Sequence, residues 1–129
     1  MKVKIHHFAY NISPNSLEVV LDLFEKLECK MYYREENERW CVIKQKTIPA
    51  SIQLIETKDK PVPTKKKINT HIGFLSDTPK EDIEKIKQWS EEKGIKFKQG
   101  KWSDKELWFD LPDLFINFVI EIMHTSIIE

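Results

Sequence analysis

Apolar and polar residues alternate along the chain with two different periods, which predict a mixture of strands and helices. Loose alternation of β-forming residues predicts a strand over residues 3–12. Asn15 or Ser16 is typical of a helix N-cap. A helix of roughly three turns is then predicted by an apolar stripe with steps of three and four, at Leu17, Val20, Leu21, Phe24 and Leu27. Three further strands are predicted at residues 29–33, 40–44 and 50–56.

The same succession of elements begins again in the second half. A strand is predicted over residues 69–76. Thr78 as N-cap, Pro79 at the first helical position and Glu81 closing a capping box indicate a helix start. An apolar stripe follows at steps of three, at Ile83, Ile86 and Trp89, and Gly94 is a suitable C-terminal stop. Strands follow at residues 96–99, 106–110 and 115–123.

Residues 57–69 separate the two halves and have a different composition. This stretch holds two prolines and five lysines and has only two aliphatic residues. We interpret it as a linker, and a solvated connector is favoured over a basic partner-binding loop. The expected organisation is one domain over residues 1–129, with an internal repeat of residues 1–57 and 69–125 joined by the linker at 57–69.

The two halves can be aligned on each other. His7 aligns with His71, and Gln53 aligns with Glu121, at offsets close to half the length of the chain. Such a repeat indicates a duplicated supersecondary unit of one strand, one helix and three strands.

Composition narrows the class of protein. The chain has 129 residues with 21 basic and 21 acidic side chains, which argues against a generally basic nucleic-acid binder. Only three glycines are present, too few for a Gly-rich phosphate loop, and no apolar run is long enough for a membrane span. The first ten residues do not resemble a signal peptide. Cys29 and Cys41 form no motif, so we expect reduced thiols in a cytoplasmic protein without nucleic-acid or membrane partners.

Four polar residues stand at matched positions in the predicted strands: His7, Gln53, His71 and Glu121. Each alone is most simply a structural polar residue. A carboxylate within the apolar segment 118–123 is costly, however, unless it is paired, bound to metal or in contact with water. Because alternate side chains of a strand share a face, the four could converge. Two imidazoles, a carboxylate and an amide oxygen suit a divalent ion, so the set favours a metal or substrate site.

Three segments carry a family resemblance. HFAYNI at 7–12, HIGFL at 71–75, and WFDLPD at 108–113 followed by VIEI at 119–122 resemble motifs of the vicinal oxygen chelate (VOC) superfamily, also called the glyoxalase/bleomycin resistance/dioxygenase family. The resemblance implies an α+β fold of two βαβββ modules whose curled mixed sheets surround a shared cleft. It places the metal ligands at His7, Gln53, His71 and Glu121. The cleft would form within one chain or between two, and a homodimer is expected.

The chain departs from the family pattern in several places. Gln53 stands where many lactoylglutathione lyases have Glu, and Asn11 replaces a common Arg. The closing turn before Glu121 is longer and lacks the usual glycine. His6 neighbours His7, but strand register favours His7, and His124 should point to the opposite face from Glu121.

The resemblance also implies a chemistry. A divalent metal (Ni, Co, Zn, Mn or Fe) would serve a lyase or isomerase that transfers a proton next to a carbonyl, with Glu121 as both metal ligand and catalytic base. The small-molecule substrate would be thioester-like or hemithioacetal-like, as in lactoylglutathione lyases or methylmalonyl-CoA epimerases. An epimerase would also need a second catalytic carboxylate, and Glu56 should lie on the other face from Gln53.

Alternative functions are left open. A metal-free binding protein similar to bleomycin-resistance proteins would sequester a ligand against aromatic side chains, for which the candidates are Tyr10, Trp40, Phe74, Trp102 and Trp108. An iron dioxygenase would use His7, His71 and Glu121, but ring-cleaving members of the superfamily are about twice this length. A fosfomycin-type transferase needs phosphonate-binding cations, and Arg34 and Arg39 are the only arginines.

Overall fold

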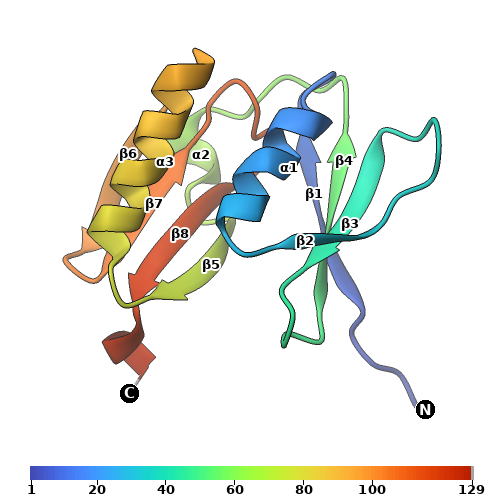
Figure 1. The fold of residues 1–129 in the computed structure, drawn as a ribbon, viewed down its shortest axis with the longest axis horizontal. Coiled ribbons are helices and arrows are strands. Elements are labelled where there is room, and N and C mark those ends of the chain that lie inside the picture. Colours follow the sequence, from blue (N-terminus) through green and yellow to red (C-terminus); the bar gives the residue numbers. More distant parts are fainter. Residues whose placement is uncertain (129) are drawn as a thin grey trace. The chain divides into compact units, whose positions relative to one another are not determined.

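The computed structural model describes residues 1–128, and the chain divides into two units, Met1–Lys60 and Pro61–Glu129. The boundary falls within the predicted linker. Each unit contains one four-stranded mixed sheet and one long helix (Figure 1). The two units are described separately below.

Unit 1 follows the predicted order of one strand, one helix and three strands. Its sheet has the order β1-β4-β3-β2, in which β1 is parallel to β4 and the other pairs are antiparallel. The elements are β1 (His7–Ile12), α1 (Leu17–Lys26), β2 (Lys30–Tyr33), β3 (Trp40–Lys44) and β4 (Ser51–Glu56). The first strand starts four residues later than predicted, and β3 has the predicted bounds.

Unit 2 repeats this topology. Its sheet has the order β5-β8-β7-β6, with β5 parallel to β8 and the other pairs antiparallel. The elements are α2 (Thr64–Lys67), β5 (His71–Ser76), α3 (Pro79–Lys93), β6 (Lys98–Ser103), β7 (Glu106–Asp110), β8 (Val119–His124) and the short 3-10 helix η1 (Thr125–Ile128). The predicted α+β fold of two βαβββ modules is therefore confirmed.

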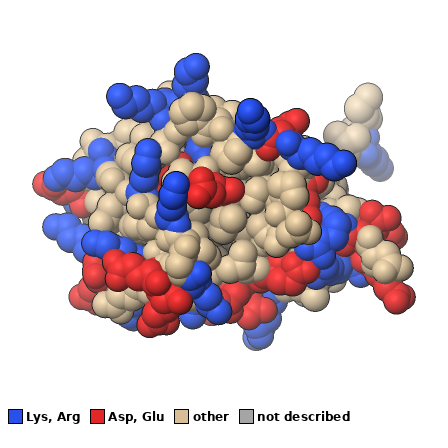
Figure 2. All heavy atoms as spheres, turned by 90° about the horizontal axis from the view of Figure 1, so that it is seen from above, with Lys and Arg blue, Asp and Glu red and all other residues tan. Residues whose placement is uncertain are grey.

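Apolar stripes on the two long helices form much of the core. On α1 the buried residues include Leu23 rather than the predicted Leu21 and Leu27, which are only half-buried. On α3 the predicted stripe of Ile83, Ile86 and Trp89 is buried as expected. No helix among residues 1–128 combines the length and the apolar character that a membrane crossing requires. Lysines and acidic residues are interspersed on the face drawn in Figure 2.

Two sequence signals at helix ends have different outcomes. Gly94 ends α3 with a left-handed φ of 69°, which glycine adopts without the steric cost of a Cβ atom. The predicted capping box at Thr78 is wrong, since the Thr78 side chain makes no capping hydrogen bond. Instead the Ser76 hydroxyl accepts a bond from the Thr78 amide and donates to the Asp82 carboxylate. Thr78 is still the N-cap residue, and Ser76 of β5 accepts the Thr78 amide bond that Glu81 would accept in a capping box.

The interpretation of residues 57–69 as a solvated connector is wrong at Lys67. This lysine, at the end of α2, is only 2% exposed. Its Nζ donates to the carbonyl of Phe115 and lies 3.0 Å from Oδ1 of the fully buried Asp110, in an ion pair rather than a well-aligned hydrogen bond. The Thr64 hydroxyl donates to the other oxygen of Asp110 at 2.6 Å. Burial raises the pKa of Asp110, against the lowering effect of Thr64 and Lys67.

Arg39 ties together two elements of unit 1, α1 and β4. Its guanidinium donates to both oxygens of Glu18 on α1 and to both oxygens of Glu56 at the end of β4. Glu56 also accepts the backbone N–H of Leu17, the first residue of α1, at 3.0 Å. A carboxylate at this position satisfies an amide that has no partner within the helix. Glu56 is therefore occupied in holding α1 against the sheet.

Replacing Lys67 with Met tests the buried ion pair. The variant leaves the Asp110 carboxylate buried without its cation, and we expect unfolding free energy to fall by about 3–5 kcal/mol. Chemical denaturation measures the change. Lys66→Met on the exposed side of α2 is the control and should change stability by less than about 0.5 kcal/mol. Equal unfolding midpoints for the two variants would contradict the assignment.

The Arg39 network predicts a dependence of stability on pH. Hydrogen bonds from Arg39 lower the pKa of Glu18 from 4.5 to about 2. Burial raises the pKa of Glu56, but bonds from Arg39 and backbone amides outweigh this and lower it overall. Carboxyls with lowered pKa values stabilise the fold above their unfolded pKa, and this contribution is lost as the pH falls through the folded value.

We therefore expect Arg39→Gln to melt at a lower temperature than the wild type near pH 7, with a gap that narrows as the pH is lowered toward about 2. Thermal melts across this range measure the gap. Arg34→Gln serves as the control, because Arg34 approaches only Glu18, at 3.6 Å. A gap that stays constant with pH would show that the charges of Glu18 and Glu56 are not responsible.

Candidate functional site

His71 and Glu121 are brought together by the parallel pairing of β5 and β8. In the register His71 pairs with Val119 and Gly73 pairs with Glu121, so the two side chains project from the same face. Nε2 of His71 lies 3.4 Å from Oε1 of Glu121. Glu121 is only 6% exposed, whereas about a third of the His71 side chain is open to solvent. The pair therefore places a buried carboxylate behind an accessible imidazole.

Two glycines make room around this pair. A Cβ atom at Gly73 would lie 3.1 Å from Oε1 of Glu121, so the missing side chain admits the carboxylate. Trp108 of β7 pairs with Glu121 across the sheet, and its indole covers Gly100 of β6 so closely that a Cβ there would lie 2.4 Å from Cζ2. Trp102 adds a second ring, 5.0 Å from the ring of His71. The sequence signal for both glycines is their place inside a strand, where glycine often marks a close approach.

Burial governs the electrostatics of Glu121. Desolvation raises its pKa above the usual 4.5, His71 opposes the shift, and Glu106 adds to it. A carboxylate with a raised pKa is a stronger base than one on the surface. An ionised carboxylate that is buried away from water is costly when it has no partner. The burial of Glu121 therefore also favours the binding of a cation beside it.

Unit 1 presents the equivalent pair of His7 and Gln53. His7 pairs with Ser51 and Ala9 pairs with Gln53 in the parallel register of β1 and β4, so the imidazole and the amide share a face. His7 is exposed and Gln53 is half-buried. Nδ1 of His7 lies 3.0 Å from Nδ1 of His6. The other ring nitrogen, Nε2, is then the one suited to a ligand.

The separation of His71 and Glu121 fits two ligands of one divalent metal ion. Two ligands of a tetrahedral ion at about 2.0–2.1 Å stand about 3.3–3.4 Å apart, and the His71–Glu121 separation is 3.4 Å. No group of three or more His, Cys, Asp or Glu side chains within residues 1–128 is arranged to hold an ion. The structure thus brings His71 into contact distance of Glu121, and in unit 1 the strand register places His7 and Gln53 on the same face.

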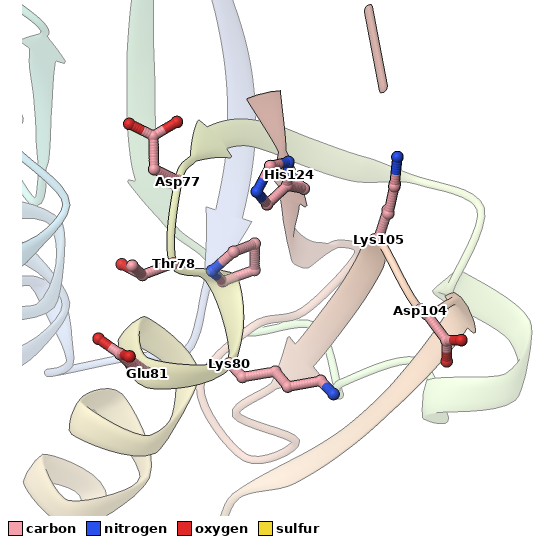
Figure 3. Close-up of a pocket in the computed structure, with 8 residues that line it drawn as sticks. Asp77, Thr78, Lys80, Glu81, Asp104, Lys105 and His124 are labelled. Carbon is pink, nitrogen blue, oxygen red and sulfur yellow. The ribbon is translucent and has the colours of Figure 1, made fainter. Parts of the chain in front are cut away.

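His124 lies away from these pairs, as its strand position predicts. It pairs with Ser76 and is three residues beyond Glu121, which places it on the opposite face of β8. Its Nδ1 interacts with Ser126. His124 lines a hollow of about 280 Å³ at the start of α3, together with Asp77, Lys80 and Lys105 among others (Figure 3). The hollow mixes acidic and basic groups, and its histidine is engaged by its own chain.

Solved structures with the same fold are numerous, although no family model and no curated protein matches the sequence. A member of the glyoxalase/bleomycin resistance protein/dioxygenase superfamily from Sphaerobacter thermophilus is 16% identical, with a TM-score of 0.59 over 96% of this chain and 98% of that one. The chain has the fold of this superfamily. TnmS3, an antibiotic-binding protein from Streptomyces, is also 16% identical, with a TM-score of 0.58 over 95% and 96% of the two chains.

A third neighbour was solved with a metal ion. The fosfomycin resistance protein FosX from Listeria monocytogenes, complexed with Mn(II) and a sulfate ion, is 14% identical, with a TM-score of 0.59 over 96% of this chain and 91% of that one. The superfamily fold thus includes a metal-bound protein and an antibiotic-binding one.

Gly100→Ala tests the packing beneath Trp108. The added methyl would overlap the indole, so we expect the ring to shift and unfolding free energy to fall by about 1–3 kcal/mol. Near-ultraviolet circular dichroism and chemical denaturation report the two effects. Gly73→Ala is the matched control, since its methyl meets only the rotatable end of Glu121 and should cost less. A Gly100→Ala protein with wild-type spectrum and midpoint would refute the close contact.

Proposed function

We propose that the protein is a divalent-metal-dependent lyase or isomerase that transfers a proton next to a carbonyl group of a small molecule. The observation that carries the proposal is the buried Glu121 carboxylate, 3.4 Å from Nε2 of His71. In this proposal His71 and Glu121 are two of the metal ligands, and His7 and Gln53 supply the others, from the same chain or from a second copy.

The charges of this ligand set suit the chemistry. Neutral His7, His71 and Gln53 with ionised Glu121 carry a charge of −1, so a divalent ion would leave the site net positive. When bound, such an ion polarises a carbonyl oxygen and stabilises a neighbouring enediolate. The ion would be Ni, Co, Zn, Mn or Fe, and the Mn(II) in FosX supports a metal at this fold.

Glu121 is the proposed base. In the metal-free chain burial raises its pKa, which favours uptake of a proton by the carboxylate, and a bound cation would oppose this rise. His71 lies 3.4 Å from Oε1 of Glu121, the ring of Trp102 lies 5.0 Å from that of His71, and Trp108 pairs with Glu121 across the sheet. The proposed substrates are hemithioacetal-like or thioester-like molecules. A second catalytic carboxylate for an epimerase is not supplied by Glu56, which is bonded to Arg39 and to the start of α1.

A metal-free ligand-sequestering protein is the second candidate. It is favoured by the TnmS3 neighbour and by the aromatic side chains beside the pairs: Trp102 against His71, and Trp40 with its ring 5.8 Å from that of Tyr33. Such a protein would bind a ligand by stacking and would need no base. In either case the proposed assembly is a homodimer, which sedimentation analysis can measure.

Elemental analysis of protein purified without chelators tests the lead proposal. We expect stoichiometric divalent metal in the wild type and a loss of metal affinity of about ten- to a hundredfold or more in His71→Ala. His124→Ala is the matched control and should keep its metal, because His124 lies on the other face of β8. Hemithioacetal isomerisation with added Ni, Co or Zn then tests the reaction, and Glu121→Gln should abolish it.

Two outcomes would overturn the metal-dependent enzyme. One is the absence of metal from the wild type together with failure to bind added Ni, Co, Zn, Mn or Fe. The other is equal metal content in the His71→Ala and His124→Ala proteins. A demetallated protein that binds its ligand at full affinity would support the sequestering protein instead.

A further inference from the structure

Unit 1 contains a hollow of about 770 Å³ that the site described above does not use. It is formed by the end of α1, by β2, and by the end of β3 with the turn that follows. Its lining is Glu28, Lys30, Met31, Tyr32, Lys44, Gln45, Lys46 and Thr47. Three of these side chains are lysines and one is acidic, so the hollow, called here the lysine pocket, has a formal charge of +2. Its volume is within the range of small-molecule sites.

Two of the lysines oppose each other directly. Lys30 of β2 pairs with Lys44 of β3 in the antiparallel register. Like charges in this position repel and destabilise a sheet. Within residues 1–128, Lys30, Lys44 and Lys46 are absent from the ion pairs, although the chain has as many acidic as basic residues. No ion pair among these residues therefore neutralises their charge.

A series of side-chain contacts runs from the lysine pocket to His7. Nζ of Lys44 lies over the ring of Tyr32, 4.4 Å from its centroid. The Tyr32 ring is 6.3 Å from that of His6, and His6 contacts His7 through their Nδ1 atoms. The strand register also places Lys44 on the face of the sheet that carries Gln53. Lys44 shares a face with Val42, and Val42 pairs with Gln53. The pocket and the unit 1 pair thus lie on one face of one sheet.

We propose that the lysine pocket binds a dianionic phosphate group. A phosphate carries nearly two negative charges at neutral pH, which matches the two opposed lysines and relieves their repulsion. Lysine ammonium groups bind phosphate as compact point charges with three donors each. A carboxylate brings only one charge and leaves one lysine uncompensated. Because the contacts lead to His7, the phosphate is the distal end of a ligand whose reacting part lies at the metal site, a placement that rests on the proposed function.

Nuclear magnetic resonance titration of the full chain tests the proposal with inorganic phosphate, phenyl phosphate and acetate as probes. All are compared at constant ionic strength and with a chelator present, so that phosphate cannot act through a metal ion. We expect phosphate to shift the amide signals of residues 28–33 and 42–47, and acetate to bind more weakly. Lys30→Gln/Lys44→Gln should weaken phosphate binding roughly tenfold or more.

The matched control is Lys65→Gln/Lys66→Gln, which removes two exposed lysines of α2 and should leave phosphate binding unchanged. The Lys30→Gln/Lys44→Gln protein loses both the repulsion between the two lysines and the contact of Lys44 with Tyr32, so it should melt close to the wild-type temperature. This keeps a loss of binding distinct from a loss of folding. Tighter binding of phenyl phosphate than of inorganic phosphate would identify a phosphate ester that stacks near Tyr32, and equal binding would identify free phosphate and overturn its placement as the end of a larger ligand.

Acetate binding as tight as phosphate, shifts spread over both units, or equal weakening in the two double variants would each overturn the proposal. The outcome is separate from that of the metal measurement. Failure of phosphate binding in the chelated protein leaves the metal content of the wild type untouched, and a protein without metal can still bind phosphate in the lysine pocket.

Discussion

A carboxylate held inside an apolar strand is the constraint on which the site depends. Glu121 lies in β8 among Val119, Ile120 and Ile122, all of them buried. A charge in such surroundings is tolerated only beside a compensating group. The parallel pairing of β5 with β8 supplies His71 at one end of the carboxylate, and Gly73 supplies the space for it. The buried pair thus requires both the strand register and a glycine.

The duplicated topology accounts for a second pair of the same layout but of different charge. In unit 1, His7 and Gln53 stand at the corresponding strand positions, and both are more open to solvent. The only carboxylate of the set thus lies in the more enclosed position, where burial raises its pKa in the metal-free chain.

Other ionic groups of the chain serve the fold. Lys67 and Asp110 form a buried pair that anchors α2, and Arg39 joins Glu18 to Glu56 at the start of α1. In each case the charges are neutralised by partners within the same unit. The lysines of the lysine pocket differ because residues 1–128 provide them with no ion-pair partner, and for this reason the pocket is the surface that we propose to bind a ligand.

The sequence by itself determined the order of the eight strands and the two long helices, the internal repeat and the four candidate ligands, because strand and helix periods are local and survive in the residue pattern. It also predicted that Glu121 and His124 lie on opposite faces. Only the tertiary structure decided that α2 forms within the predicted linker and buries Lys67, that Ser76 accepts the amide of Thr78, that Gly100 admits Trp108 and that Lys30 opposes Lys44. These features depend on which residues distant in the sequence become neighbours. The energies of burial and charge pairing are set by that proximity, which local spacing does not encode.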